Sequence, residues 1–376
     1  MLQAWTGLLF GAPVDRLRVL VARDYSPRHF LLTDSGTSAL ALAISACARE
    51  PGRAPVVALP AYGCYDLATA ADAAGARVVL YDVDPATLGP EWSSFSAALR
   101  AGVDAVVVVH QYGIPVDMDR VESEVRDAGV VVIEDAAQAV GARHGGRPAG
   151  TIAALSVLSF GRGKGRTGGN GGALLVHDDR LVPLVKRLRV GPSSRGLREA
   201  LLVTMQWLLA RPGIYGVLTR IPQLGLGETV YRQPRRAAGI SRAAAACLST
   251  IWTGAERETS ARRRHAEEYR LGPVQSTPIS LIAPPAQGEP GWLRFPVVAH
   301  GAEGWLAGAR AKSLGIMPGY PRALPDLPGF DRVQNRSDAF PGARELARLL
   351  MTLPTHGRLA ATDRDRILEL IRSFAA

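Results

Sequence analysis

Short, mostly apolar runs alternate with segments of helical pattern along the first half of the chain. Seven runs have the composition of buried β-strands, and they lie at residues 29–33, 56–59, 77–81, 105–109, 130–133, 155–160 and 173–177. Between most of them, apolar residues recur at helical spacing, near residues 41–49, 66–74, 92–100 and 118–128. Buried strands that alternate with helices are typical of a mainly parallel sheet covered by helices. The sequence therefore predicts an α/β fold with a seven-stranded, mainly parallel sheet sandwiched by helices.

The second half of the chain predicts a smaller unit. Residues 240–271 have a helix-forming composition, and we expect a long helix that connects the two parts. Proline-rich loops at 273–290 and 317–329 separate this helix from short strands and from a terminal helix at 361–376. We therefore predict a large domain at 1–235 and a smaller C-terminal α/β domain at 236–376.

An apolar helical insertion at about 195–227 stands apart from this pattern. Its most apolar segment, 201–210, is stopped by the Arg-Pro-Gly sequence at 211–213 and has about half the length of a membrane span. A core or interface helix is the favoured interpretation, and a helix that lies on a membrane surface is the alternative.

Composition limits the class of protein. The chain has 376 residues, 47% of them hydrophobic, which is enough for a large buried core. Cys47, Cys64 and Cys247 have neither metal nor redox spacing and are odd in number, so we expect no metal site, no disulfide framework and a reducing, cytoplasmic location. No basic segment precedes the first apolar stretch, so we expect no signal peptide.

The net charge of +10 is spread along the chain, with local excesses at 235–236 and 262–264. These arginines have no interleaved aromatic residues and no nucleic-acid-binding motif, so nucleic acid is not an expected partner. Anionic small molecules explain the charge economically, and solvent-exposed helix faces are the alternative explanation.

Candidate chemistry begins with Lys164, which lies in a glycine-rich loop between two predicted strands. The chain has only three lysines among 44 basic residues, and lysine, unlike arginine, can lose its proton near neutral pH and attack a carbonyl carbon. The loop matches G-x-G-x-x-G, but a strand follows where a dinucleotide fingerprint needs a helix, and the Walker A pattern also fails. A solvated lysine in a mobile turn is the alternative.

Polar residues also follow three of the predicted strands, at 60–65, 110–113 and 134–139. Ligands of such sheets bind at the carboxyl ends of the strands. Asp135 alone would be interpreted as a helix cap. Taken with Lys164, it completes the two protein groups that pyridoxal phosphate (PLP) needs, which are a lysine that forms a Schiff base and a carboxylate that keeps the pyridine nitrogen protonated.

Small and hydroxylated residues begin the first helical segment after the strand at 29–33, in the sequence Asp-Ser-Gly-Thr-Ser-Ala-Leu at 34–40. The unpaired N–H groups of a helix N-terminus make a good phosphate site. Simple capping of the helix by Asp34 or Ser35 is the alternative.

The order of these motifs resembles the DegT/StrS family of PLP-dependent sugar aminotransferases, which have the fold of aspartate aminotransferase (fold type I). The resemblance rests on GTSAL, PAYGCY, DAVVVVHQYGIPVDMD, VVIEDAAQAVGARHGGRPAGT, SFGRGK and GGNGGALLVHDD. It is close over about 30–190 and returns at 261–269, 291–298 and 353–359. EDAAQA followed by SFxxxK at this separation is a specific combination.

The resemblance implies a role for each candidate residue. Lys164 would form the internal aldimine with PLP and then act as acid and base, while Asp135 pairs with the pyridine nitrogen. Gln138 would lie near the phenolic oxygen of the cofactor. The phosphate would be held by Gly36, Thr37, Ser38 and Ser159. The implied reaction is a ping-pong transfer of an amino group from a donor, glutamate, to a keto sugar linked to a nucleotide, in a homodimer with sites across its interface.

The chain departs from the family at four places, one of which is the apolar insertion at about 195–227. The aromatic residue that stacks on the cofactor ring is replaced by Cys64, with Tyr65 beside it, and the sequence does not decide which of the two contacts the ring. The family's Asn-Tyr-Arg stretch, which reaches into the neighbouring protomer's site, is Val-Tyr-Arg here, at 230–232. A histidine of the acceptor-binding loop has no counterpart in residues 319–330.

Three rival functions remain at this point. One is a different PLP reaction on the same fold, either a dehydration or a carbon–carbon step. Some dehydrating members of the family have histidine at the lysine position, so Lys164 favours transamination. The second is a descendant that binds ligand without turnover, and the third is a NAD-dependent dehydrogenase.

Overall fold

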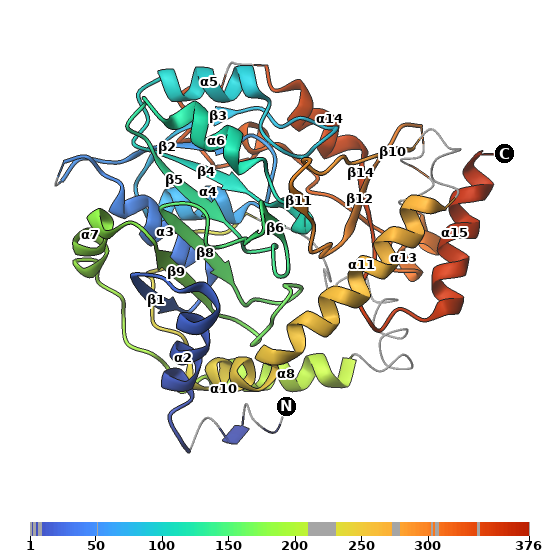
Figure 1. The fold of residues 1–376 in the computed structure, drawn as a ribbon, viewed down its shortest axis with the longest axis horizontal. Coiled ribbons are helices and arrows are strands. Elements are labelled where there is room, and N and C mark those ends of the chain that lie inside the picture. Colours follow the sequence, from blue (N-terminus) through green and yellow to red (C-terminus); the bar gives the residue numbers. More distant parts are fainter. Residues whose placement is uncertain are drawn as a thin grey trace.

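A seven-stranded sheet forms the centre of the larger part of the molecule (Figure 1). The computed structural model describes residues 10–50, 52–209, 231–272, 279–301, 308–336 and 339–375, together with residues 2, 5, 6 and 304. The strands follow the order β1, β9, β8, β5, β4, β2, β3, and their bounds are β1 His29–Thr33, β2 Val56–Pro60, β3 Arg77–Tyr81, β4 Ala105–Val109, β5 Val131–Asp135, β8 Leu155–Ser159 and β9 Gly172–Val176. Six strands point the same way and β9 is antiparallel to them. The predicted fold class is confirmed.

Helices cover both faces of the sheet, because alternate residues of each strand point to opposite sides. In β2, Val57 and Leu59 belong to the apolar core under α3 (Gly36–Ala46) and α4 (Asp66–Ala73), whereas Val56 and Ala58 belong to the core under α5 (Trp92–Arg100) and α6 (Met118–Val125). The bounds of the helices in this part are α2 Pro13–Tyr25, α3 Gly36–Ala46, α4 Asp66–Ala73, α5 Trp92–Arg100, α6 Met118–Val125, α7 Val182–Lys186 and α8 Leu197–Leu209, with short 3₁₀ turns η1 Gln111–Gly113 and η2 Asp179–Leu181.

The predicted single connecting helix at 240–271 is divided into two. It comprises α10 Arg242–Ile251, the 3₁₀ turn η4 Trp252–Gly254 and α11 Ala255–Leu271. The turn places Trp252 in the core, where only 1% of it is exposed, against the Phe160 ring and under the Arg166 guanidinium. The predicted single helix is therefore interrupted at this turn.

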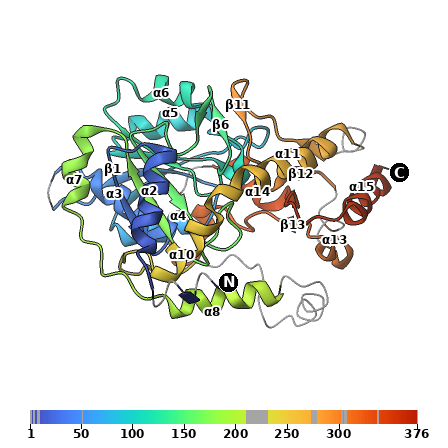
Figure 2. The ribbon, with the colours of Figure 1, turned by 60° about the horizontal axis from the view of Figure 1, so that its bottom comes forward.

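The two parts of the molecule meet around α11, which in both views leads from the large sheet to the smaller C-terminal part (Figures 1 and 2). Beyond it lie β10 Ile279–Leu281, β12 Phe295–Ala299, β13 Met317–Pro318 and β14 Leu350–Leu353, which form an antiparallel sheet, and α13 Ala309–Ser313, η6 Leu324–Asp326, α14 Pro341–Leu349 and α15 Ala361–Ala375. The division into domains expected at 235/236 stays a prediction. α10 follows this boundary in the sequence but packs on α2 within the core of the large part.

A third, small sheet connects the two halves of the sequence. It consists of β6 Arg143–His144, β7 Arg147–Pro148 and β11 Gly288–Glu289, and β6 lies in the middle. β6 and β7 follow the large-domain strand β5, whereas β11 belongs to the C-terminal half. This sheet therefore fixes the C-terminal half to the loop region beyond β5.

The first part of the predicted apolar insertion is the helix α8, and the rest of the insertion, 210–227, lies outside the described residues. One side of α8 contacts α10 through Ala200, and Leu201 and Met205 are exposed. None of the helices in the described part of the chain is long and apolar enough to cross a membrane.

Candidate active site

A small cavity, with a volume of about 30 Å³, lies at the carboxyl edge of the sheet, where β2, β4, β5 and β8 end. Parallel strands bring their carboxyl ends to one edge, so loops far apart in the sequence meet there. The cavity is lined by Gly36, Thr37, Leu40, Cys64, Asp66, Leu67, Val109, Asp135, Ala137, Gln138, Val157, Ser159 and Lys164. Seven of the nine residues singled out from the sequence are in this set, and Ser38 and Tyr65 are not.

Lys164 reaches the cavity from the loop between β8 and β9. The two ends of this loop are bonded to each other, because Phe160 N–H donates to the Gly171 oxygen at 2.8 Å and Gly168 N–H donates to the Phe160 oxygen at 3.0 Å. Gly163 has φ +74° with open space around it, a backbone conformation that favours glycine. The alternative of a lysine directed only into solvent is disfavoured, because Lys164 is half-buried and lines the cavity.

Asp135 ends β5 and is 9% exposed. Its Oδ1 accepts a hydrogen bond from Ala137 N–H at 3.0 Å, which orients the carboxylate at the cavity wall. Burial raises the pKa of Asp135, while this hydrogen bond and the charge of Lys164 act in the opposite direction. A cation in the cavity would favour the carboxylate further.

Glu134, the preceding residue, points to the other side of β5 and is fully buried. Its Oε1 accepts from His110 Nε2 at 2.8 Å and Gly150 N–H at 2.6 Å. Its Oε2 accepts from Ser156 Oγ–H and from backbone N–H groups of the 152–153 segment. Burial opposes ionisation, but these donors outweigh it and lower the pKa of Glu134 to about 2. Glu134 thus anchors the strand that presents Asp135.

The start of α3 forms another wall. Ser35 caps the helix by accepting from Ser38 N–H at 3.1 Å, as the capping alternative predicts. Gly36 packs so closely on the end of β8 that an added Cβ would lie 2.6 Å from Ser159 Cβ. Thr37 and Ser159 line the cavity, whereas the Ser38 hydroxyl bonds to Ser35 Oγ at 2.9 Å. Ser35 therefore caps α3, and the first turn of the same helix also lines the cavity.

Of the two residues left undecided by the sequence, Cys64 lines the cavity and Tyr65 does not. Tyr65 is buried and packs against the Tyr320 ring at a centroid distance of 6.3 Å. Burial raises the pKa of the Cys64 thiol to about 12, so this residue faces the cavity as a neutral, weakly polar group.

Gln138 links the cavity to the C-terminal half of the chain. Its Nε2 donates to the Tyr320 hydroxyl at 2.8 Å, and its Oε1 accepts from Tyr112 N–H at 3.0 Å. The rings of Tyr112 and Tyr320 stack with centroids 6.0 Å apart. Sequence reasoning missed Tyr320, which lies within the 319–330 segment where the family's histidine has no counterpart. It also missed Asp66, a cavity-lining carboxylate directly after the 60–65 stretch.

The stretch at 230–232 begins outside the described residues, since Val230 is not among them. Tyr231 packs on its own chain: its hydroxyl donates to Asp72 of α4, and its ring lies 6.1 Å from that of Phe330. Asp72 also accepts from Arg332 Nε at 2.8 Å. The expected contact of this stretch with a neighbouring protomer stays a prediction.

Comparison with known proteins places this geometry in context. The model of the DegT/DnrJ/EryC1/StrS aminotransferase family matches residues 4–372. The "pleiotropic regulatory protein" of Geobacillus stearothermophilus is 25% identical over 97% of this chain and 90% of its own length. The dTDP-3-amino-3,4,6-trideoxy-alpha-D-glucose transaminase of Micromonospora megalomicea is also 25% identical, over 97% of this chain and 90% of its own.

Solved structures show the same fold. DesV of S. venezuelae, in complex with a ketimine intermediate, superposes with a TM-score of 0.77 at 23% identity, over 98% of this chain and 90% of its own. The E. coli GDP-4-keto-6-deoxy-D-mannose-3-dehydratase with bound hydrated PLP has a TM-score of 0.75 at 16% identity, over 98% of this chain and 96% of its own.

Proposed function

The chain belongs to the DegT/DnrJ/EryC1/StrS aminotransferase family, and on this premise we propose that it uses PLP to transfer an amino group from glutamate to a keto sugar. The observation that carries the proposal is the meeting of Lys164 and the buried carboxylate of Asp135 on the walls of one cavity. An amine that can attack a carbonyl and a carboxylate that can pair with a pyridinium nitrogen are the groups PLP chemistry requires.

The other walls of the cavity also fit PLP. The N-terminal turn of α3 offers backbone N–H groups and the positive end of an eleven-residue helix, which suits a phosphate. The close packing of Gly36 on Ser159 keeps bulk out of this turn. Thr37 and Ser159 would hold the phosphate. Cys64 and Val157, which also line the cavity, would lie near the pyridine ring. When bound, PLP supplies the electron sink that stabilises negative charge at the substrate carbon.

Lys164 has two tasks in this scheme. Its amine would hold the cofactor until an amino donor replaces it, and once released it would carry a proton between the substrate carbon and the cofactor carbon. The loop ends are pinned to each other, so the lysine would return to the same place after each half-reaction. Release of one product before the second substrate binds predicts ping-pong kinetics.

Asp135 would hold a proton on the pyridine nitrogen through its charge. Its buried position makes that interaction strong, because few water molecules screen it. The Ala137 N–H bond and the anchored Glu134 beside it would keep the carboxylate in position. Gln138, oriented by Tyr112 and Tyr320, would approach the phenolic oxygen of the ring.

The acceptor we propose is a keto sugar activated by a nucleotide. Relatives named as acting on such compounds include the dTDP-sugar transaminase, and the net charge of +10 favours a phosphorylated ligand. A homodimer and a cytoplasmic location complete the proposal. The family resemblance supports the former, and the three free cysteines, without disulfide, support the latter.

The first test is spectroscopic. Purified protein is mixed with PLP, its visible absorbance is recorded before and after borohydride reduction, and the modified peptide is mapped by mass spectrometry. We expect PLP to be attached at Lys164, and no PLP to be attached in the Lys164→Ala variant. We also expect the visible absorption band of the bound PLP to disappear when glutamate is added. Conversion of a dTDP-linked keto sugar to an amino sugar then tests the acceptor. Attachment at Lys186 or Lys312, or no response to glutamate, would contradict the proposal.

A second candidate is a ligand-binding or regulatory protein of the same fold, which the name of the Geobacillus relative favours. Such a protein would bind PLP at Lys164 but would not exchange an amino group with glutamate. A dehydratase, by contrast, would convert a keto-deoxysugar without leaving nitrogen on the product. Mass spectrometry of the sugar product with ¹⁵N-labelled glutamate separates the three.

A further inference from the structure

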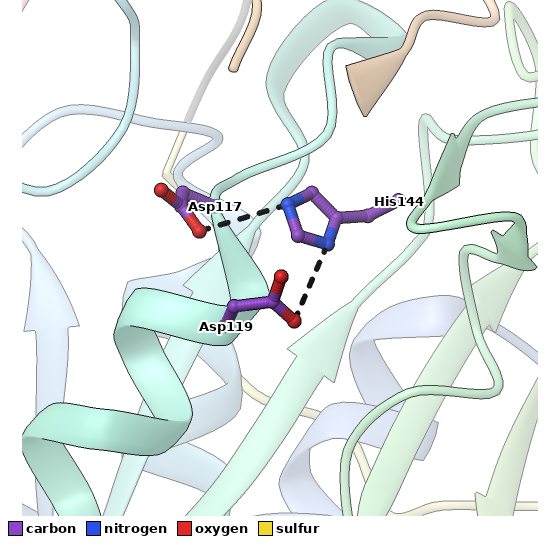
Figure 3. Close-up of side chains that lie close together, drawn as sticks. All are labelled: Asp117, Asp119 and His144. Carbon is purple, nitrogen blue, oxygen red and sulfur yellow. Dashed lines mark ion pairs between the residues drawn. The ribbon is translucent and has the colours of Figure 1, made fainter. Parts of the chain in front are cut away.

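Two carboxylates and one imidazole form a cluster away from the candidate active site, between the start of α6 and the β6–β7 turn (Figure 3). Asp117 caps α6, Asp119 lies in its first turn, and His144 ends β6. One ligand atom from each residue lies within 4.8 Å of the other two. We propose that this cluster, the His144 site, binds a divalent transition-metal ion of the Zn²⁺ class.

The state of His144 points to a ligand. Its side chain is 98% buried, and Figure 3 shows the ring between the two carboxylates, with one nitrogen facing each. Nε2 is 3.6 Å from Asp117 Oδ1 and Nδ1 is 3.9 Å from Asp119 Oδ1, both beyond hydrogen-bond distance. Nδ1 is buried and has no hydrogen-bond partner among the described residues. A buried nitrogen left in this way is costly, and a coordinated ion removes the cost.

The charge around the cluster points the same way. Arginine is abundant in this chain, yet in the described part of the structure the ion pairs of Asp117 and Asp119 are those with His144 alone. The nearby Arg147 pairs with Glu122 instead. Two carboxylates would balance the charge of a divalent cation.

The donor set selects the kind of ion. Imidazole nitrogen suits Zn²⁺, Cu²⁺ and Ni²⁺, whereas Mg²⁺, Ca²⁺ and Mn²⁺ prefer oxygen ligands. Zinc bonds to nitrogen and oxygen are about 2.0–2.2 Å long, so two ligand atoms on one ion lie roughly 3–3.5 Å apart. One ion binds only one ring nitrogen, so it would take Nδ1 beside Asp119, and Asp117, which faces Nε2, would turn toward it; the aspartate side chains are 43% and 51% exposed, which leaves room for this rotation. Water would complete the coordination on the exposed side.

Neighbouring groups already orient two of the ligands. Arg120 N–H donates to Asp117 Oδ1 at 3.1 Å, a contact of the kind that fixes metal ligands from outside. His144 is held by its pairing with Gly288 of β11 and Arg147 of β7. An ion here would therefore join α6 to the small sheet and, through β11, to the C-terminal half of the chain.

The test is a Zn²⁺ titration of the PLP-loaded, tag-free protein by calorimetry, with thermal unfolding in parallel. We expect one site per chain and a rise in Tm with Zn²⁺ that exceeds the rise with Mg²⁺. Asp119→Asn and His144→Gln should each weaken Zn²⁺ binding at least about tenfold, since each removes a ligand. Asp119 is half-exposed, so its variant should fold even if the variant of the buried histidine does not.

Matched controls come from the same chain. Asp15, an exposed aspartate in the first turn of α2, and the half-exposed His300 are changed to Asn and Gln, and these variants should bind Zn²⁺ as the unmodified protein does. An anomalous-scattering peak at the zinc edge between Asp119 and His144 locates the ion. Absence of binding, or equal binding by Asp119→Asn, would mean that the cluster is only a pair of long ion pairs and would overturn the proposal.

Discussion

The buried carboxylate of Glu134 offers a quantitative prediction about stability. In the Glu134→Gln variant an NH₂ group replaces one of two oxygens that together accept from His110, from Ser156 and from backbone N–H groups. Donor would then face donor in a fully buried site. The acid form of glutamate meets the same conflict, so the pKa of Glu134 measures the size of the effect.

The magnitude follows from that pKa. A fall from 4.5 to about 2 corresponds to about 3 kcal/mol in favour of the ionised, folded form, at about 1.4 kcal/mol per pKa unit. Since the folded-state pKa is the lower one, this stabilisation is complete above pH 4.5 and is lost as the pH falls through about 2. We therefore expect Glu134→Gln to lower the free energy of unfolding by about 3 kcal/mol at pH 7.

The assay is urea unfolding followed by circular dichroism, at fixed protein and PLP concentrations, from pH 7 down to pH 3. The difference between Glu134→Gln and the unmodified protein should shrink below pH 4.5. Glu122→Gln, at an exposed ion pair with Arg147, is the control and should change stability by less than about 1 kcal/mol. A Glu134→Gln variant as stable as the control, or a difference independent of pH, would refute the reasoning.

Three further predictions concern the cavity. Asp135→Asn should keep PLP bound but lower turnover with glutamate by at least about 10²-fold, because the charge that faces the pyridine nitrogen is gone; normal turnover in a stopped-flow half-reaction would reject this role. Gly36→Ala should lower stability by about 1–3 kcal/mol and weaken PLP binding, because its Cβ meets Ser159; adding Ser159→Gly should restore the stability but not the PLP affinity, since the Ser159 hydroxyl is lost, and no recovery of stability in urea unfolding would contradict the clash. Tyr320→Phe removes the hydroxyl that orients Gln138 and should cost about 1 kcal/mol, seen as PLP binding about fivefold weaker; an unchanged PLP affinity would argue against a positioning role.

The large sheet could be predicted from the sequence because each strand is a short run buried on both faces. Residues such as Val57 and Val56 serve opposite cores, so both must be apolar, and a run of that kind has few other interpretations. The candidate site residues at the strand ends could be predicted for the same reason. Once the strands are parallel, Asp135 and Ser159 must reach the same edge.

Features that depend on contacts between residues far apart in the sequence could not be predicted. The ring of Trp252, at the turn between α10 and α11, contacts Phe160 and Arg166, and nothing in the local pattern signals either partner. Tyr320 contacts Gln138 across 182 positions of sequence. The choice between Cys64 and Tyr65 depended on which way two neighbouring side chains point, which a loop sequence without periodicity does not encode. The His144 site escaped notice because its ligands come from separate elements.

The closed base of the Lys164 loop has a consequence for how this protein can change over evolution. Hydrogen bonds between Phe160, Gly168 and Gly171 separate the tip of the loop from the strands that it joins. Substitutions or insertions between these bonds can therefore alter the reach of the lysine without disturbing the sheet. We expect natural variation at the exposed Arg162 to change reaction rates and acceptor choice with little effect on folding, whereas Gly165 and Arg166, which pack on Val140 and Trp252, should vary less.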